Sequence, residues 1–195
     1  MPVLEERAIP LNGWTVLVGW DALPFSVARF HTPPGTGNLH ARLRLPPGAH
    51  AWLNGTRLSP NAEGDFDLEG LLERNEPNRL AVAGAVAAGS LVVGPRVYVA
   101  RQTLRRDQGR LLGEVWVRNT LENTVNAYVT VSGPGVLLES PATVPPGVTQ
   151  IVRLESRSQP LPAGGEIELE TRVEKEEEAM ERGYTVVSRW RWVPD

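Results

Sequence analysis

The segment that most constrains the fold of this chain is residues 49–58, with the sequence AHAWLNGTRL. Small or apolar residues at 49, 51 and 53 alternate with His50 and Trp52, and a period of two is typical of a strand with one buried face. Asn54 and Gly55 follow at once. A type I′ turn needs positive φ at both central residues, which Asn-Gly adopts at little steric cost. The segment therefore predicts a tight β-hairpin.

Proline and glycine punctuate the rest of the chain in the same manner. The 195 residues include 17 prolines and 19 glycines, which separate short runs rich in Val and Leu. The clearest breaks are at 33–35, 46–48, 133–135 and 145–147. Short apolar runs between such turns are typical of an all-β protein. A chain of this length fits one large domain or two small ones.

The spacing of the expected strands changes after Gly94, and we place a domain boundary there, giving domains 1–94 and 95–195. In the first domain strands are expected at 12–20, 25–31, 39–45, 49–58 and 79–83, a short helical turn is one interpretation of 69–74, and 91–93 is an apolar run. In the second a charged turn is expected at 105–110, and strands at 97–104, 111–119, 125–131, 136–140, 148–155, 167–173 and 184–193. This number of short strands predicts an immunoglobulin-like sandwich.

Charge and composition exclude several classes of function. The net charge of −3 gives no basic surface for nucleic acid, and the absence of cysteine excludes a thiolate metal site. The first residues lack the pattern of a signal peptide, and no apolar run approaches the roughly 20 residues that span a membrane. A cytoplasmic protein without membrane contact is expected. The three histidines show no ligand spacing, so neither a metal nor another cofactor is expected.

Residues 49–83 resemble the N-terminal jelly-roll, "sugar-binding" domain of the family 2 glycoside hydrolases. The resemblance rests on AHAWLNG at 49–55, GDFDL at 64–68, LL at 71–72 and NRLAV at 78–82. The second half is similar in the order and spacing of 97–99 and 111–119 to the immunoglobulin-like domain of that family. The resemblance implies a galactose-binding-like jelly-roll sandwich over 1–94, followed by an immunoglobulin-like β-sandwich over 95–195.

In that family the catalytic glutamates lie on a (β/α)₈ barrel that follows these two domains, and such a barrel needs about 250 residues. The 195 residues leave no room for one, so we expect no enzyme. The expected function is a non-catalytic binding or accessory protein that recognises a carbohydrate or another small polar ligand. The alternative is a structural or protein-interaction module, as a homo-oligomer or a subunit of a larger assembly.

A candidate ligand set comes from aromatic and polar residues near strand ends in the first domain. Trp20 and Asp21 follow an expected strand, where the loops of a sandwich gather. Trp52 points away from the inner face by the alternation of its strand, and Asn61 lies in the loop that follows the hairpin. A nearby carboxylate pair, Asp65 and Asp67, either flanks a turn or binds a cation weakly.

A candidate interface comes from Trp116 and Tyr128 in the second domain. Val115 and Val117 occupy the inner face of their strand, so Trp116 points outward. If strands 111–119 and 125–131 pair through the loop 120–124, Tyr128 lies beside it. Such a pair serves as a cross-strand stabiliser, a seam against the other domain or a partner site.

Overall fold

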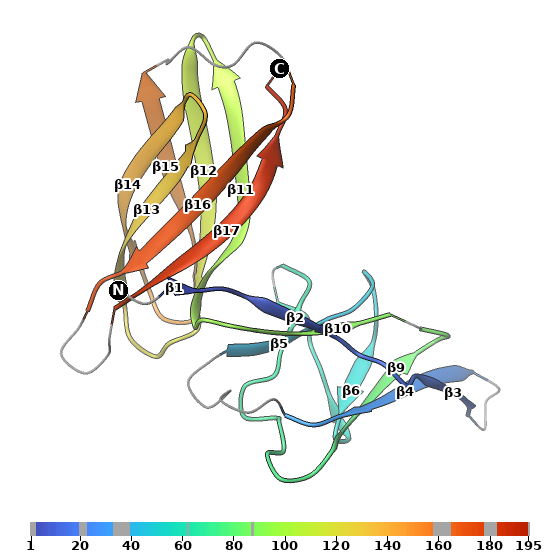
Figure 1. Ribbon diagram of the computed structural model, residues 1–195. Coiled ribbons are helices and arrows are strands. Elements are labelled where there is room, and N and C mark those ends of the chain that lie inside the picture. The colour runs from blue at the N-terminus through green and yellow to red at the C-terminus, as the bar shows by residue number, and fades with distance from the viewer. Residues whose placement is uncertain are drawn as a thin grey trace. The chain divides into compact units, whose positions relative to one another are not determined.

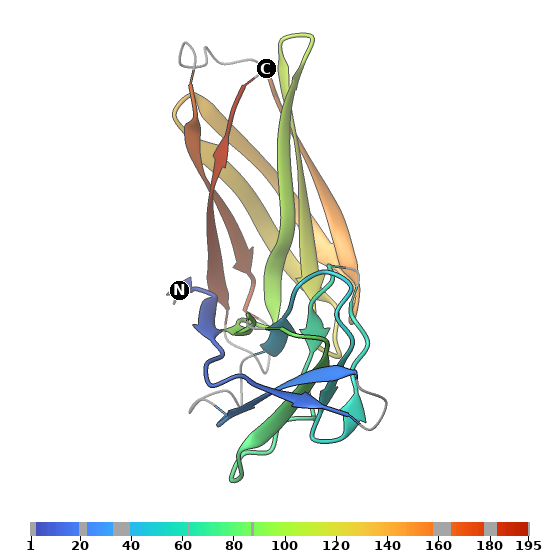
Figure 2. The same ribbon diagram turned by 90° about the vertical axis from the view of Figure 1, so that its right-hand side faces the viewer.

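The computed structural model describes residues 3–19, 23–32, 40–61, 63–86, 88–157, 165–177 and 183–194. Every regular element in this part of the chain is a β-strand, which confirms the all-β fold. The chain divides into two compact units, one formed by Glu6–Gly94 and the other by Pro95–Asp195 together with the first five residues. Figures 1 and 2 draw both units.

The Glu6–Gly94 unit contains two antiparallel sheets. One has the strand order β2-β10-β5-β8, formed by β2 (Arg7–Pro10), β10 (Ser90–Gly94), β5 (His40–Arg44) and β8 (Phe66–Asp67). The other has the order β3-β4-β9-β6-β7, formed by β3 (Thr15–Val18), β4 (Pro24–Phe30), β9 (Asn78–Ala83), β6 (Ala51–Leu53) and β7 (Thr56–Arg57). The core of this unit takes alternate residues from both sheets, such as Leu43 and Leu80, and both side chains are fully buried.

The hairpin predicted at 49–58 is confirmed, and it does more than reverse the chain. Asn54 and Gly55 have φ values of 51° and 86°, as a type I′ turn requires. The Asn54 side chain accepts a hydrogen bond from the Arg79 backbone N–H at 2.8 Å and donates to the Asn78 side chain at 2.9 Å. It also donates to the carbonyl of Leu71 at 3.2 Å. The turn residue therefore fastens the hairpin to β9 and to the loop before it.

The Pro95–Asp195 unit contains two sheets around a second core rich in valine and leucine (Figures 1 and 2). The smaller has the order β11-β12-β15, formed by β11 (Val97–Asp107), β12 (Arg110–Asn119) and β15 (Thr149–Arg157). The larger has the order β1-β17-β16-β13-β14, formed by β1 (Val3–Leu4), β17 (Tyr184–Trp192), β16 (Ile167–Lys175), β13 (Val125–Gly133) and β14 (Val136–Val144). Because β1 pairs with β17, these first residues join this unit and not the domain expected at 1–94.

The charged turn expected at 105–110 is shorter in the structure, because β11 and β12 continue to a tight turn in which Gln108 and Gly109 both have positive φ. Two other local predictions were wrong. Pro141 does not end a strand, because β14 lies at the edge of its sheet, where the missing N–H is tolerated. Residues 69–74 form turns and bends with no helical turn.

The condition that 111–119 pairs with 125–131 is not met, because β12 and β13 lie in different sheets. Asn119 explains why the chain passes from the sheet of β12 to the sheet of β13. Its side chain is fully buried and donates to the carbonyls of Asn123 at 2.8 Å and Val144 at 3.0 Å, while it accepts from the Leu121 N–H at 2.9 Å. These bonds hold the loop 120–124 against the end of β14, so the chain passes to the second sheet.

Substitution of Asn54 tests its double role as turn residue and fastener. We expect Asn54→Gly to lower the free energy of unfolding by about 1–2 kcal/mol, because the side-chain hydrogen bonds are lost while the positive φ is kept. Asn54→Ala costs about 1 kcal/mol more, since an L side chain is strained in this conformation. Urea unfolding of the full chain measures both. The same changes at exposed Asn75 serve as the control, and equal effects at the two positions would contradict the fastening role.

Candidate ligand-binding face

A hollow of about 410 Å³ lies on the outer face of the sheet β3-β4-β9-β6-β7. It is lined by Asn12, Gly13, Thr15, Leu17, Val27, Arg29 and Arg79. The register explains why these residues meet: Thr15 pairs with Val27, and Arg29 pairs with Arg79. Thr15 and Val27 are short, while the leucine and the arginines around them are long, so a depression remains between them. Its volume lies in the range of roughly 300–1,000 Å³ typical of small-molecule sites.

The inner faces of β4 and β9 determine what the outer face presents. Ser26 and Ala28 of β4 are buried opposite Val82 and Leu80 of β9. Because neighbouring residues of a strand point to opposite faces, the odd-numbered residues of both strands point outward. The Ser26 hydroxyl donates to the carbonyl of Gly84 at 2.9 Å and accepts from the Val86 N–H at 2.7 Å. This buried group anchors the chain beyond the end of β9.

Two arginines dominate the polar part of the hollow. Arg29 and Arg79 are directly opposite in the antiparallel register, and both side chains are exposed. Across the described residues, neither guanidinium has a hydrogen bond or a carboxylate partner. Directly opposed like charges are unfavourable in a sheet. The hollow therefore holds two cationic groups with free donors.

Trp52 lies on the same outer face as the hollow. Its neighbours Ala51 and Leu53 are fully buried, and the Trp52 side chain is only partly buried, as the alternation predicted. Its ring meets that of Phe25 edge to face, with centroids 6.0 Å apart. Phe25 of β4 precedes Val27 and Arg29 on that face. The sheet thus presents an aromatic pair on the same face as the arginine pair, with Val27 between Phe25 and Arg29 along β4.

The structure describes only one of the other residues of the predicted ligand set, Asn61. Trp20 and Asp21 lie outside the described residues. The Asn61 side chain is used locally: its Oδ1 accepts the N–H groups of Glu63 and Asp65, at 3.1 and 3.0 Å. Its Nδ2 donates to the carboxylate of Asp67 at 3.3 Å. Asn61 thus shapes its own turn.

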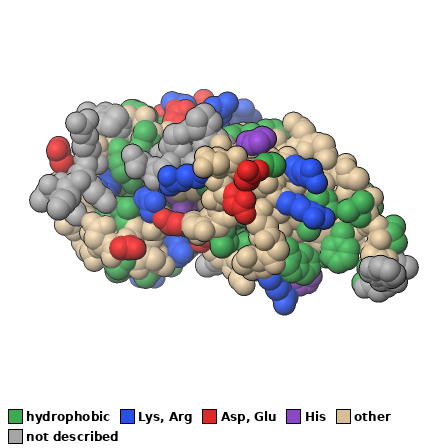
Figure 3. Space-filling view, turned by 90° about the horizontal axis from the view of Figure 1, so that it is seen from below, with side chains coloured by type: hydrophobic (Ala, Val, Ile, Leu, Met, Phe, Trp, Pro, Cys, Tyr) green, Lys and Arg blue, Asp and Glu red, His purple; other side chains and the backbone are tan. Residues whose placement is uncertain are grey.

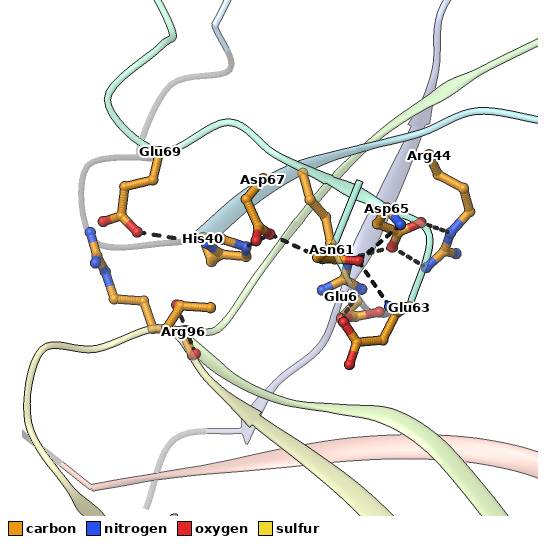
Figure 4. A network of polar contacts seen from close by, with 11 residues as sticks. Glu6, His40, Arg44, Asn61, Glu63, Asp65, Asp67, Glu69 and Arg96 are labelled. Atoms are coloured by element: carbon orange, nitrogen blue, oxygen red, sulfur yellow. Dashed lines mark hydrogen bonds and ion pairs between the residues drawn. The ribbon is translucent and has the colours of Figure 1, made fainter. Parts of the chain in front are cut away.

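Figure 4 shows the charged network to which Asn61 leads. Asp65 accepts hydrogen bonds from Arg42 at 2.8 Å and from Arg44 at 3.0 Å, and Arg42 also pairs with Glu6. Arg42 is only 3% exposed and Asp65 only 7%. The carboxylate therefore offsets the charge of a buried guanidinium, a role that the sequence did not indicate for Asp65.

His40 and Asp67 form a second part of the same network. Nε2 of the buried His40 ring lies 2.9 Å from Oδ1 of Asp67. The two carboxylates of 65 and 67 flank a turn and one short strand, which is the first of the two roles expected for them. In the part of the chain that the structure describes, no group of three or more histidine or acidic side chains is placed to hold a metal ion.

Trp116 and Tyr128 belong to different sheets, so the expected Trp–Tyr pair does not form. Trp116 points outward from β12 as predicted, with the Arg101 guanidinium 5.0 Å from its ring centroid. The Tyr128 hydroxyl lies 3.3 Å from Glu139. Partial desolvation of the phenol and the negative charge of Glu139 raise the pKa of Tyr128 above its usual value. An interface at either residue stays a prediction.

Sequence reasoning did not find Arg29 and Arg79. Both lie on strands that the sequence predicts, at outward positions of the alternation. Their pairing joins residues 50 positions apart, and a local pattern carries no information on such a register. The described residues contain no helix that is long and apolar enough to cross a membrane.

Comparison with known proteins finds no matching family model and no matching curated protein. Solved structures do match. A β-glucuronidase of Bacteroides uniformis has a TM-score of 0.69 at 14% identity, covering 97% of this chain and 32% of the enzyme. An exo-chitosanase of Amycolatopsis orientalis, CsxA, has a TM-score of 0.63 at 12% identity, covering 88% of this chain and 25% of the enzyme.

A β-D-glucuronidase of Dictyoglomus thermophilum also matches, with a TM-score of 0.62 at 9% identity, covering 97% of this chain and 44% of the enzyme. The expected structural likeness to β-glucuronidases is therefore confirmed over most of the chain. The chain spans between a quarter and less than half of the length of these enzymes. At these identities the likeness shows a shared fold.

Removal of one charge from the buried network tests whether Asp65 has a structural role. Asp65→Asn leaves Arg42 without its buried carboxylate partner, and we expect the free energy of unfolding to fall by about 3 kcal/mol. Asp107→Asn is the control, because Asp107 pairs with Arg105 on the surface at 3.6 Å and such pairs contribute at most about 1 kcal/mol. Urea unfolding at pH 7 measures both. Equal losses for the two variants would contradict the role given to Asp65.

Proposed function

We propose that this chain is a non-catalytic carbohydrate-binding module with its ligand site in the hollow on the β3-β4-β9 face. The proposed architecture is a jelly-roll domain followed by an immunoglobulin-like domain, as in the accessory part of family 2 glycoside hydrolases. The structural matches support this architecture. Each match covers at least 88% of this chain and at most 44% of the matched enzyme, and the enzymes are named as β-glucuronidases or as an exo-chitosanase.

The observation that carries the proposal is the lining of the hollow. Leu17 and Val27 supply apolar surface, while Asn12, Thr15 and the arginines supply hydrogen-bonding groups. A concave site with apolar walls and a few convergent polar groups is the usual form of a small-molecule site. A sugar presents both apolar C–H faces and hydroxyl groups, so it matches such a lining. The ring of Trp52 lies on the same outer face, outside the set of residues that line the hollow.

Binding to a glycan array of neutral and acidic mono- and oligosaccharides tests the proposal. We expect the full chain to bind at least one class of glycan, and Thr15→Phe to abolish that binding, because the larger side chain fills the hollow. Thr15 is exposed on an edge strand, where phenylalanine is well accommodated.

Thr143→Phe is the matched control, because Thr143 is an exposed strand residue of the other unit. We expect this variant to bind as the natural sequence does. The absence of binding to every glycan would contradict the proposal. Binding that survives Thr15→Phe would contradict the location of the site.

One observation favours a protein-interaction module as a second candidate. Strand β3 lies at the edge of its sheet and carries Val16, Leu17 and Val18, which are 54%, 47% and 71% exposed. An apolar edge strand with free backbone groups is a place where a further strand can add. Light scattering separates the candidates: a dimer that Val16→Lys converts to a monomer would support this one.

A further inference from the structure

We propose that the ligand of the hollow is an acidic carbohydrate whose anionic group sits between Arg29 and Arg79. This inference rests on the proposed function and adds the chemical class of the ligand. Its starting point is that the two arginines are directly opposite in the register of β4 and β9. Side chains in such positions have Cβ atoms about 5 Å apart, so the two guanidinium groups can reach one anion together.

Two other arginines of the same unit show how a carboxylate compensates neighbouring guanidinium groups. Arg42 and Arg44 are two residues apart on one face of β5, and Asp65 accepts hydrogen bonds from both. Within the described residues, Arg29 and Arg79 have no such carboxylate. An anion from solution would relieve the repulsion between them and satisfy their donors.

The chemistry of the guanidinium group selects the type of anion. Its planar fork donates two parallel hydrogen bonds to a carboxylate or a sulfate. A neutral sugar gains only ordinary hydrogen bonds from the same donors, which are weaker than those to a charged group. The remaining lining, with Leu17, Val27 and Thr15, then contacts the sugar ring.

Net charge does not supply a broad field that attracts anions to this chain. The net charge of the chain is −3, and the face of the molecule seen in Figure 3 mixes acidic, basic and hydrophobic side chains. Attraction of an acidic ligand therefore depends on the local arginine pair. A concave wall strengthens such an attraction, because water is partly excluded from it.

Titration with matched glycosides tests the inference. Methyl β-glucuronide and methyl β-glucoside differ by a carboxylate in place of a hydroxymethyl group, and glucose 6-sulfate and inorganic sulfate complete the set. We expect the natural sequence to bind the glucuronide or the sulfated sugar about tenfold more tightly than the glucoside, with a preference that falls as salt is added. Isothermal titration calorimetry of the full chain measures each affinity.

Arg29→Gln and Arg79→Gln should each lower the affinity for the acidic sugar about tenfold and so remove the preference, while the affinity for the glucoside falls much less, because the glucoside loses only ordinary hydrogen bonds. Arg106→Gln, which removes one exposed charge in the other unit, should change neither affinity. Urea unfolding distinguishes ligand binding from a stabilising role of these arginines. The free energy of unfolding of the two hollow variants should equal or exceed that of the natural sequence, because a repulsion is removed.

The possible outcomes separate this inference from the proposed function. Equal affinity for the glucuronide, the sulfated sugar and the glucoside would overturn the inference and leave a neutral-carbohydrate module. Binding of inorganic sulfate as tightly as of the acidic sugars would overturn it as well, since the site would then recognise a free anion. No binding of any saccharide would overturn both.

Discussion

The pairing register of β4 with β9 is the constraint on which the candidate site depends. It is fixed from the inner face, where Ser26 and Ala28 are buried opposite Val82 and Leu80. A shift of one residue would turn all these side chains toward solvent and bury the charged ones. The same register therefore holds Arg29 opposite Arg79 on the outer face, although that contact itself is unfavourable. The core determines the geometry, and the outer face is left available for a ligand.

Two uses of arginine are visible within one unit. On the face of β5, Arg42 is buried and is paired with Asp65, and such a pair must remain intact because an unpaired buried charge is costly. On the face of β4 and β9, the arginines are exposed and carry no partner among the described residues. A charge that is compensated within the chain contributes to the fold. A charge that is left open at a hollow is a candidate for recognition.

The sequence predicted what depends on local pattern and turn chemistry. The hairpin around Asn54 and Gly55, the alternation of β5, β9 and β16, and the outward directions of Trp52 and Trp116 all follow from a period of two or from the φ preference of Asn-Gly. The match to glycoside hydrolase structures agrees with the motif recognised at 49–83.

What the sequence could not predict depends on contacts between distant segments. The sequence left open whether the loop 120–124 joins a hairpin, and buried Asn119 bonds to Val144 and directs the chain to the other sheet. Arg29 and Arg79 were not recognised, because only the sheet brings them together. In each case the decisive partner lies outside the window that a local pattern covers.

The central claim is that an acidic sugar binds on the outer face of β3, β4 and β9. Chemical-shift mapping of ¹⁵N-labelled full chain with methyl β-glucuronide tests it most directly. The account predicts shifts concentrated at residues 12–17, 27–29 and 79, with the Arg29 and Arg79 side-chain resonances among them, and no change at 149–153 in the other unit. Shifts absent from the hollow, or centred on the network around Asp65, would contradict it.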